Sequence, residues 1–132
     1  MKMPKEIDVE LYAPCGFNCI SCEKYQSPCI GCLKGDRGKT KAALKCKIKA
    51  CLDKKKVKYC GRCSEFPCTL IKKHSKKSQK RYNLNTQESA KRIQYTGINK
   101  INIQDHEKWT CKECGGIIHF QTNTCSECNK KY

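Results

Sequence analysis

The sequence predicts a small α+β fold with short helices and cysteine-rich turns, stabilised by bound metal more than by a hydrophobic core. Two observations predict this class. Fourteen of the 132 residues are cysteine, and only 38% are hydrophobic even when the cysteines are counted. A chain this short with so few large apolar side chains buries little surface when it folds, so it needs disulfides or metal ions as additional stabilisation.

The N-terminal residues favour metal over disulfides. A secretory signal has an uninterrupted apolar run of roughly 7–15 residues, but charged side chains interrupt every such run here, namely those of Lys5, Glu6, Asp8 and Glu10. No segment approaches the roughly 20 apolar residues of a membrane span. We therefore expect a cytoplasmic protein with no membrane segment, in which paired cysteines hold metal more often than they form disulfides.

The clearest metal-ligand pattern lies at the C-terminus, where Cys111/Cys114 and Cys125/Cys128 form two Cys-x2-Cys pairs separated by ten residues. Two tight turns at this spacing can face each other and close a tetrahedral site of four sulfur ligands, as in a zinc ribbon. The intervening residues would form a hairpin, in which we expect His119 to be packed or exposed rather than a ligand.

The other ten cysteines are also candidate metal ligands, in zinc-knuckle turns: the pairs Cys19/Cys22, Cys29/Cys32 and Cys60/Cys63, and the single residues Cys15, Cys46, Cys51 and Cys68. Two four-sulfur sites would use eight of them, whereas one such site and a two-metal cluster with six thiolates would use all ten. The order of the cysteines leaves the grouping open, because cross-braced sites interleave their ligands. We expect two to four zinc ions per chain, and an iron–sulfur cluster at the N-terminal cysteines is the alternative.

Catalysis is not predicted. Cys15-x3-Cys19-x2-Cys22 has the spacing of the cysteine triad of radical S-adenosylmethionine enzymes. Those enzymes need most of a β/α barrel, and a full barrel typically takes about 250 residues, so this chain is too short. Acidic residues are scattered and the three histidines are isolated. The sequence therefore contains no recognisable apparatus for acid–base catalysis.

Cys68 has two interpretations. It follows Pro67 near a predicted helix start, where backbone N–H groups and the helix dipole stabilise a thiolate and would make it reactive. The favoured interpretation is that it binds metal beside Cys60 and Cys63.

The spacing of apolar residues predicts short elements. Residues 6–13 alternate between apolar and polar side chains, which predicts a strand. Apolar residues spaced four apart between 44 and 52 predict a helix within residues 39–55. On such a helix Cys46 and Cys51 would lie about 140° apart. Either the helix begins after Cys46, or the two cysteines serve different sites.

Two further helices are predicted downstream. One begins near Phe66-Pro67, because proline is favoured in the first helical turn, and leads into a basic linker or exposed helix end at residues 75–85. The other covers residues 86–95, with Thr86 as its N-cap and Gly97 as its stop.

The organisation predicted from these elements has three parts. Residues 1–84 form a cysteine-rich metal-binding domain, residues 85–108 a helical connector and residues 109–132 the zinc ribbon. Isoleucines 98, 101 and 103 are expected to pack beneath the connector helix, and Trp109 is expected to pack against the ribbon.

The cysteine segments resemble a known family. APCGFNCISC, SPCIGC, LKCKIKACLDKKKVKYCGRCSEFPC and WTCKECGG are similar to the cysteine-rich family called domain of unknown function 3795, over roughly Leu11 to Gly116. Ten cysteines match in order and spacing. One departure is Pro14, where the family usually has tyrosine. The resemblance implies a metal-binding fold that holds zinc, and it implies no established activity.

The charge is concentrated. The formal net charge is +16, and residues 34–82 contain 18 Lys or Arg against three acidic residues. Such a segment attracts phosphate, which predicts contact with the backbone of RNA or DNA and weak sequence preference. The candidate nucleic-acid-binding residues are Lys39, Lys41, Lys45, Lys47, Lys49, Lys54, Lys55, Lys56, Lys58, Arg62, Lys72, Lys73, Lys76, Lys77, Lys80 and Arg81.

Two other function classes stay open at this point. One is an adaptor, in which rigid zinc knuckles present a surface to a protein partner. The other is an iron–sulfur, redox or metal-handling protein. Salt-sensitive retention of nucleic acid would favour the first prediction, and stoichiometric co-purification of a protein would favour the adaptor.

Overall fold

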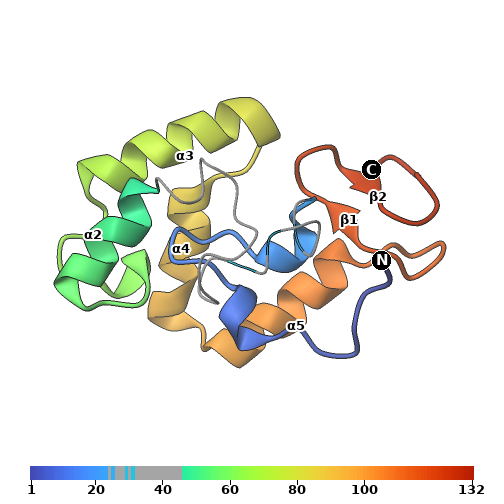
Figure 1. The fold of residues 1–132 in the computed structure, drawn as a ribbon, viewed down its shortest axis with the longest axis horizontal. Coiled ribbons are helices and arrows are strands. Elements are labelled where there is room, and N and C mark those ends of the chain that lie inside the picture. The colour runs from blue at the N-terminus through green and yellow to red at the C-terminus, as the bar shows by residue number, and fades with distance from the viewer. Residues whose placement is uncertain (24, 26–28, 30, 32–45) are drawn as a thin grey trace.

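The computed structural model describes residues 1–23, 25, 29, 31 and 46–132. Its elements are helical apart from one short sheet (Figure 1). In chain order they are the 3-10 turns η1 (Val9–Leu11) and η2 (Cys19–Ser21), helix α2 (Lys47–Lys55), the 3-10 turn η3 (Cys60–Arg62), helices α3 (Thr69–Tyr82), α4 (Thr86–Tyr95) and α5 (Ile98–Trp109), and strands β1 (Ile118–His119) and β2 (Thr124–Cys125).

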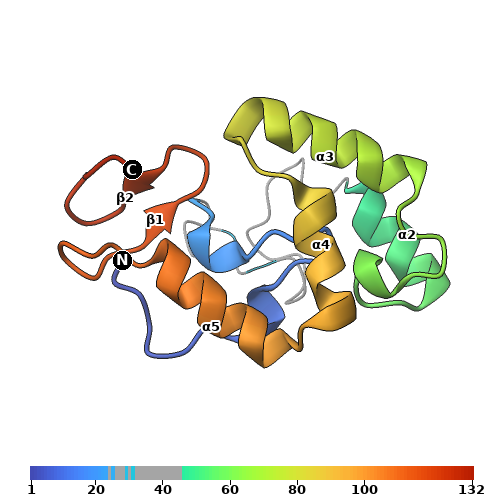
Figure 2. The same cartoon turned by 180° about the vertical axis from the view of Figure 1, so that it is seen from behind.

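Helix α4 lies at the centre of the described fold. It packs against α3, η3 and α5, while α2 packs against α3. Figures 1 and 2 show α2 and α3 at one end of the molecule and the hairpin of β1 and β2 at the other, with the N-terminal segment between them. The cysteine-bearing turn η3 is therefore held by a helix that comes later in the chain.

The main core is small and includes cysteines. Its buried members are Ile7, Leu11, Ala13, Cys15, Cys19, Ile20, Ile48, Leu52, Cys60, Ile71, Ala90 and Ile117. A second cluster surrounds the hairpin, where Trp109 and Phe120 are buried with Cys111 and Cys125. The ring of Phe17 stacks on that of Phe120 with centroids 4.7 Å apart, and Phe17 packs against both clusters, so it connects the two.

The first residues of the chain run alongside the C-terminal segment. Lys2 forms an antiparallel bridge with Gly116, and the N–H of Met3 donates to the carbonyl of Gly115 at 3.0 Å. The N–H of Ile117 donates to the carbonyl of Met1 at 3.1 Å.

The predicted three-part division of the chain stays a prediction.

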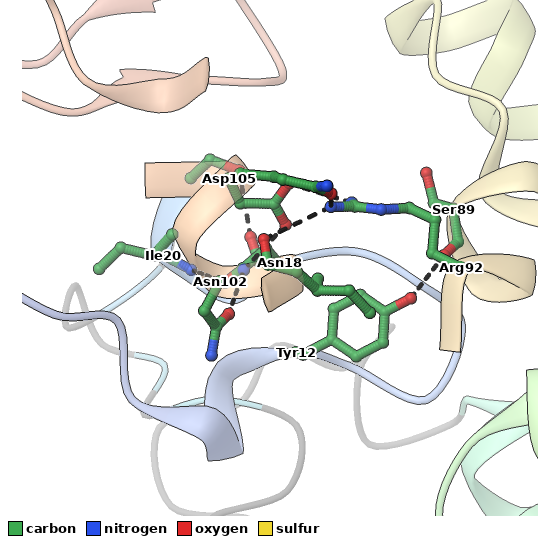
Figure 3. Close-up of polar contacts among 10 residues, drawn as sticks. Tyr12, Asn18, Ile20, Ser89, Arg92, Asn102 and Asp105 are labelled. Carbon is green, nitrogen blue, oxygen red and sulfur yellow. Dashed lines mark hydrogen bonds and ion pairs between the residues drawn. The ribbon is translucent and has the colours of Figure 1, made fainter. Parts of the chain in front are cut away.

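A buried polar network joins the N-terminal segment to α4 and α5 (Figure 3). Asn18 Nδ2 donates to Asn102 Oδ1 at 2.9 Å and to Asp105 Oδ2 at 3.0 Å. Arg92 pairs with the other carboxylate oxygen of Asp105 at 3.0 Å. The hydroxyl of Tyr12 donates to a backbone carbonyl of α4. These groups satisfy one another away from water, which buried polar atoms require.

The strand predicted over residues 6–13 is wrong. The chain makes the 3-10 turn η1 there, and Asp8 caps it by accepting a hydrogen bond from the N–H of Glu10 at 2.9 Å. A short polar side chain that bonds to its own backbone competes with strand pairing, and this local bond prevails.

The structure decides between alternatives that the sequence left open for two helices. Helix α2 begins at Lys47 with Cys46 as its N-cap, so the helix starts after Cys46; Leu44 lies outside the described residues. Helix α3 begins at Thr69 with Cys68 as its N-cap, so Pro67 precedes the helix and does not occupy its first turn as expected. It continues to Tyr82, which agrees with the expected helix end rather than a linker, and Ile71, Ser75 and Ser78 form a buried face along it.

Helix α4 has the predicted bounds, but its N-cap is Asn85, whose side chain accepts from the N–H of Glu88 at 3.1 Å. Gly97 was expected to end α4 but is the N-cap residue of the next helix, α5. A helix over the residues of α5 was not predicted. On α5 Ile101 is buried, whereas Ile103 is 70% exposed and does not pack beneath α4. The prediction treated the isoleucines as one packed group. On a helix, Ile101 and Ile103 lie on different faces, so only one of them is buried.

Candidate metal centre

The four C-terminal cysteines converge on one point. The sulfur atoms of Cys111, Cys114, Cys125 and Cys128 all lie within 4.8 Å of one another, and among the described residues this group is suited to hold a metal ion. The Sγ atoms of Cys111 and Cys128 are 3.7 Å apart, and those of Cys114 and Cys125 are 3.5 Å apart. All four are free thiols. The arrangement offers a complete set of four sulfur donors.

Local backbone geometry brings the two pairs together. Gly115 has φ +75°, which a residue with a side chain rarely adopts, and it turns the chain after the first pair. The hairpin that follows pairs Ile118 with Cys125. This register brings the second pair back to the first.

Backbone N–H groups point at two of the sulfur atoms. The N–H of Gly116 lies 3.4 Å from Cys114 Sγ, and the N–H of Glu127 lies 3.4 Å from Cys125 Sγ. Each comes two residues after its cysteine, as a tight turn places it. Donors in these positions favour the charged thiolate over the thiol.

Tyr132 is a site residue that the sequence analysis missed. Its hydroxyl lies 3.0 Å from Cys111 Sγ and accepts from the N–H of Lys112 at 3.3 Å. The hydrogen bond between the Tyr132 hydroxyl and Cys111 Sγ is the main cause that lowers the pKa of the Cys111 thiol to about 6. No motif marks a tyrosine 21 residues away, because only the folded hairpin brings it to the sulfur.

Two residues near the centre play other parts. Trp109 is buried in the cluster around the hairpin, together with Cys111. His119 is half-buried on β1 and does not belong to the four-sulfur group. Burial lowers the pKa of its ring, with an opposing effect from Glu23.

Five of the N-terminal cysteines lie near one another. Cys60 is buried beside Cys68, Cys63, Cys51 and Cys46. Burial, followed by the charges of these four neighbours, raises the pKa of the Cys60 thiol to about 12. Among the described residues, however, only the C-terminal group has all of its sulfur atoms within 4.8 Å.

The first cysteine turn lies next to this N-terminal group, because the N–H of Cys60 donates to the carbonyl of Pro14 at 3.1 Å. Cys15 and Cys19 are buried and Cys22 is half-buried, and the side chain of Asn18 caps η2 by accepting from the N–H of Ile20. From the C-terminal hairpin, Gln121 Nε2 donates to Cys22 Sγ at 3.1 Å.

Cys29 is half-buried, and Cys32 lies outside the described residues.

Comparison with known proteins gives one match. Residues 25–73 match the family described as Protein of unknown function (DUF3795). The predicted family resemblance is confirmed. The match is narrower than the 11–116 expected from the cysteine spacing, and it contains the five neighbouring cysteines. No curated protein and no solved structure matches the chain.

The DUF3795 segment also contains many of the basic residues. Lys39, Lys41 and Lys45 lie outside the described residues. The other candidates on or next to α2 and η3 are exposed apart from the half-buried Lys49: Lys47, Lys54, Lys55, Lys56, Lys58 and Arg62. Three of them pair with carboxylates, as Lys49–Asp53, Lys55–Glu65 and Lys58–Glu10. These pairs reduce the positive charge available on this side.

Helix α3, which begins within the DUF3795 segment and extends beyond it, is different. Its six candidates are all exposed: Lys72, Lys73, Lys76, Lys77, Lys80 and Arg81. They follow two rows with a spacing of four residues, so they share the solvent face opposite Ile71, Ser75 and Ser78. The helix contains no acidic residue. None of the helices in the described residues is both long and apolar enough to cross a membrane.

Proposed function

We propose that this is a zinc protein whose C-terminal cysteines form a structural zinc ribbon. The distances between sulfur atoms carry the proposal. A tetrahedral site with Zn–S bonds of about 2.3 Å has sulfur atoms about 3.8 Å apart along each edge. The separations of 3.7 Å between Cys111 and Cys128 and of 3.5 Å between Cys114 and Cys125 are close to this edge length.

The donor set supports a structural role. Four cysteines fill a tetrahedral shell and leave no position for water or substrate, which is the pattern of structural zinc. Bound zinc would supply folding free energy by joining the two turns. Hydrogen bonds from the chain stabilise the negative charge of the thiolates. The N–H groups of Gly116 and Glu127 and the hydroxyl of Tyr132 each donate to a sulfur atom.

Metal analysis tests this proposal. The full chain, purified under reducing conditions without added metal, should contain zinc and little iron. Cys114→Ser should remove one equivalent, and Thr122→Ala, an exposed change in the same hairpin, should remove none. A wild-type chain that is free of metal and still folded in reductant would overturn the proposal. Iron in place of zinc would replace it by a single-iron sulfur site.

Nucleic-acid binding is the second candidate function, and the acid-free solvent face of α3 supports it. Six cations there have no carboxylate partner among the described residues. Five of the six are lysine, which contacts phosphate as a point charge and reads no base edge well. The expected ligand is therefore a nucleic-acid backbone.

Salt dependence tests the second candidate. Binding of a mixed-sequence RNA or DNA should weaken steeply with salt, with a slope of about −0.9 per phosphate on duplex DNA. The triple change K72Q/K76Q/K80Q should flatten that slope by about three. K5Q/K91Q/K100Q removes the same charge at exposed positions elsewhere and should leave more of the binding. Equal losses of binding in both variants would show that net charge, and not the face of α3, determines the binding. A protein that co-purifies in stoichiometric amount would favour an adaptor.

A further inference from the structure

A second set of four cysteines lines a single small cavity. Cys51, Cys60, Cys63 and Cys68 surround a space of about 20 Å³. A space of this size holds about one water-sized group. It is too small for an organic substrate, and a single ion fits it.

The four cysteines come from separate elements. Cys51 lies on α2, Cys60 and Cys63 begin and follow the turn η3, and Cys68 is the N-cap of α3. The turn is closed by a hydrogen bond from the N–H of Cys63 to the carbonyl of Cys60 at 3.0 Å. Cys68 makes no side-chain cap bond, so its sulfur is not committed to the helix end. Tertiary packing therefore brings together sulfur atoms that are up to 17 residues apart.

The rest of the cavity wall is apolar. It consists of Ile48, Leu52, Phe66, Leu70 and Ile71, with the stem of Lys55 at one side. Neutral thiols would also suit such a wall, since a buried free cysteine behaves as a small hydrophobe. A four-coordinate metal site requires four thiols around one space of ionic size. The packing of an apolar core does not require that arrangement.

One cation already lies at the rim. Lys55 Nζ is 3.9 Å from Cys63 Sγ and also pairs with Glu65. Four thiolates around one divalent ion leave two negative charges, and a nearby ammonium group offsets part of them.

We propose that Cys51, Cys60, Cys63 and Cys68 bind a second thiophilic divalent metal ion of the zinc class, which joins α2, η3 and α3. This site is separate from the C-terminal centre and does not depend on it. Its sulfur atoms are spread more widely than those of the C-terminal group, so binding draws them inward and couples to the packing of the helices. Cys46 is the nearby thiol that does not line the cavity and is not a ligand of this site.

Differential alkylation of the unmodified full chain tests the proposal without any variant. A thiol reagent is added to the native zinc-loaded protein, and each cysteine is quantified by peptide mass spectrometry as chelator is increased. Cys51, Cys60, Cys63 and Cys68 should be protected and should lose protection together, at a chelator concentration different from that of Cys111, Cys114, Cys125 and Cys128. Rapid labelling of the first four, with the C-terminal four protected, would overturn this proposal and leave the zinc ribbon standing. Labelling of all eight would overturn both.

Variants give a second readout. Cys60→Ser should lower bound zinc by one equivalent and leave the protection of the C-terminal cysteines intact. Cys68→His keeps a ligand of a different type, so it should retain the metal and shift the cobalt-substituted visible spectrum. Cys46→Ser is the matched control and should keep the full zinc content. Loss of one equivalent in Cys46→Ser but not in Cys60→Ser would contradict the assigned ligand set.

Discussion

Arg92 Nη1 lies 3.0 Å from Asp105 Oδ1, in an ion pair whose acidic side chain is only 6% exposed. The second oxygen of Asp105 accepts from Asn18 at 3.0 Å. Asn18 also caps the turn that carries Cys19. The pair therefore connects α4 and α5 to the first cysteine turn, so a change at Asp105 acts on the position of candidate ligands far away in the sequence.

Replacing Asp105 by alanine should destabilise the fold strongly. The change leaves the guanidinium of Arg92 without its carboxylate, and breaking a buried pair typically costs about 3–5 kcal/mol. Asp53→Ala is the matched control, because it removes an exposed carboxylate from a Lys49 pair at i, i+4, worth about 0.3–0.5 kcal/mol. Urea unfolding in zinc and reductant measures both. Similar losses in the two variants would show that the Arg92–Asp105 pair is not specially stabilising.

Tyr132→Phe should weaken metal binding at the C-terminal centre. It removes the hydroxyl that lies 3.0 Å from Cys111 Sγ, and the loss of an outer partner of a ligand typically costs about 10–100-fold in affinity. The pKa of Cys111, lowered to about 6 chiefly by this bond, should rise in the variant, so zinc should be released at a higher pH. Competition with a chromophoric chelator across pH measures both effects. Tyr95→Phe, at a 69% exposed residue, should change neither.

Gly61→Ala should destabilise the protein more than an ordinary glycine change. A Cβ at Gly61 would lie 2.2 Å from the carbonyl oxygen of Ala90 on α4, a contact that requires the backbone to shift. Overpacking of this kind typically costs about 1–3 kcal/mol. At Gly97 a Cβ would meet nothing within 4 Å, so Gly97→Ala is the control. Thermal unfolding of the two variants should differ clearly, and equal midpoints would contradict the close packing of η3 on α4.

His74 should make the stability fall with acid. Burial, and then the charge of Lys77, lowers the pKa of its ring in the folded state. The folded protein therefore binds fewer protons than the unfolded chain, whose histidine has a pKa of about 6.5. The stability contributed by neutral His74 is complete above that value and is lost as the pH falls from it towards the lowered pKa.

The variant His74→Gln isolates this effect. Glutamine can retain a hydrogen bond to Thr86 Oγ1, which lies 2.9 Å from His74 Nδ1, and it does not titrate. The free energy of unfolding should decrease less steeply for the variant than for the wild type between about pH 7 and pH 5.5. The thiol sites titrate in both proteins, so the difference between the two curves reports His74. Parallel curves would rule out its contribution.

Predictions from the sequence succeeded where the determining contacts are local. The paired Cys-x2-Cys turns at the C-terminus predicted a four-sulfur group because each turn fixes two sulfur atoms within four residues. The bounds of α4 were predicted from a polar cap at its start and a glycine after its end, although the N-cap is Asn85 rather than Thr86. The strand over 6–13 failed because the side chain of Asp8 bonds to its own backbone, and α5 was missed because only three isoleucines were considered along its length.

Other relationships depend on packing between distant residues. Nothing in the spacing of the cysteines assigns Cys51 and Cys68 to the same cavity, or brings Tyr132 to Cys111 and Gln121 to Cys22. Each contact exists because two helices or turns dock, and the free energy of docking is summed over many apolar contacts rather than encoded in one motif.

The sequence by itself determined that the chain is rich in cysteine, strongly basic and poor in apolar side chains, and that two of its cysteine pairs are spaced to meet. The tertiary structure alone decided which further cysteines become neighbours and which lysines on one helix face lie free of the carboxylates that the structure describes. The physical reason is range: a turn or a helix cap is fixed by interactions within about five residues, whereas a shared cavity is fixed by how helices pack.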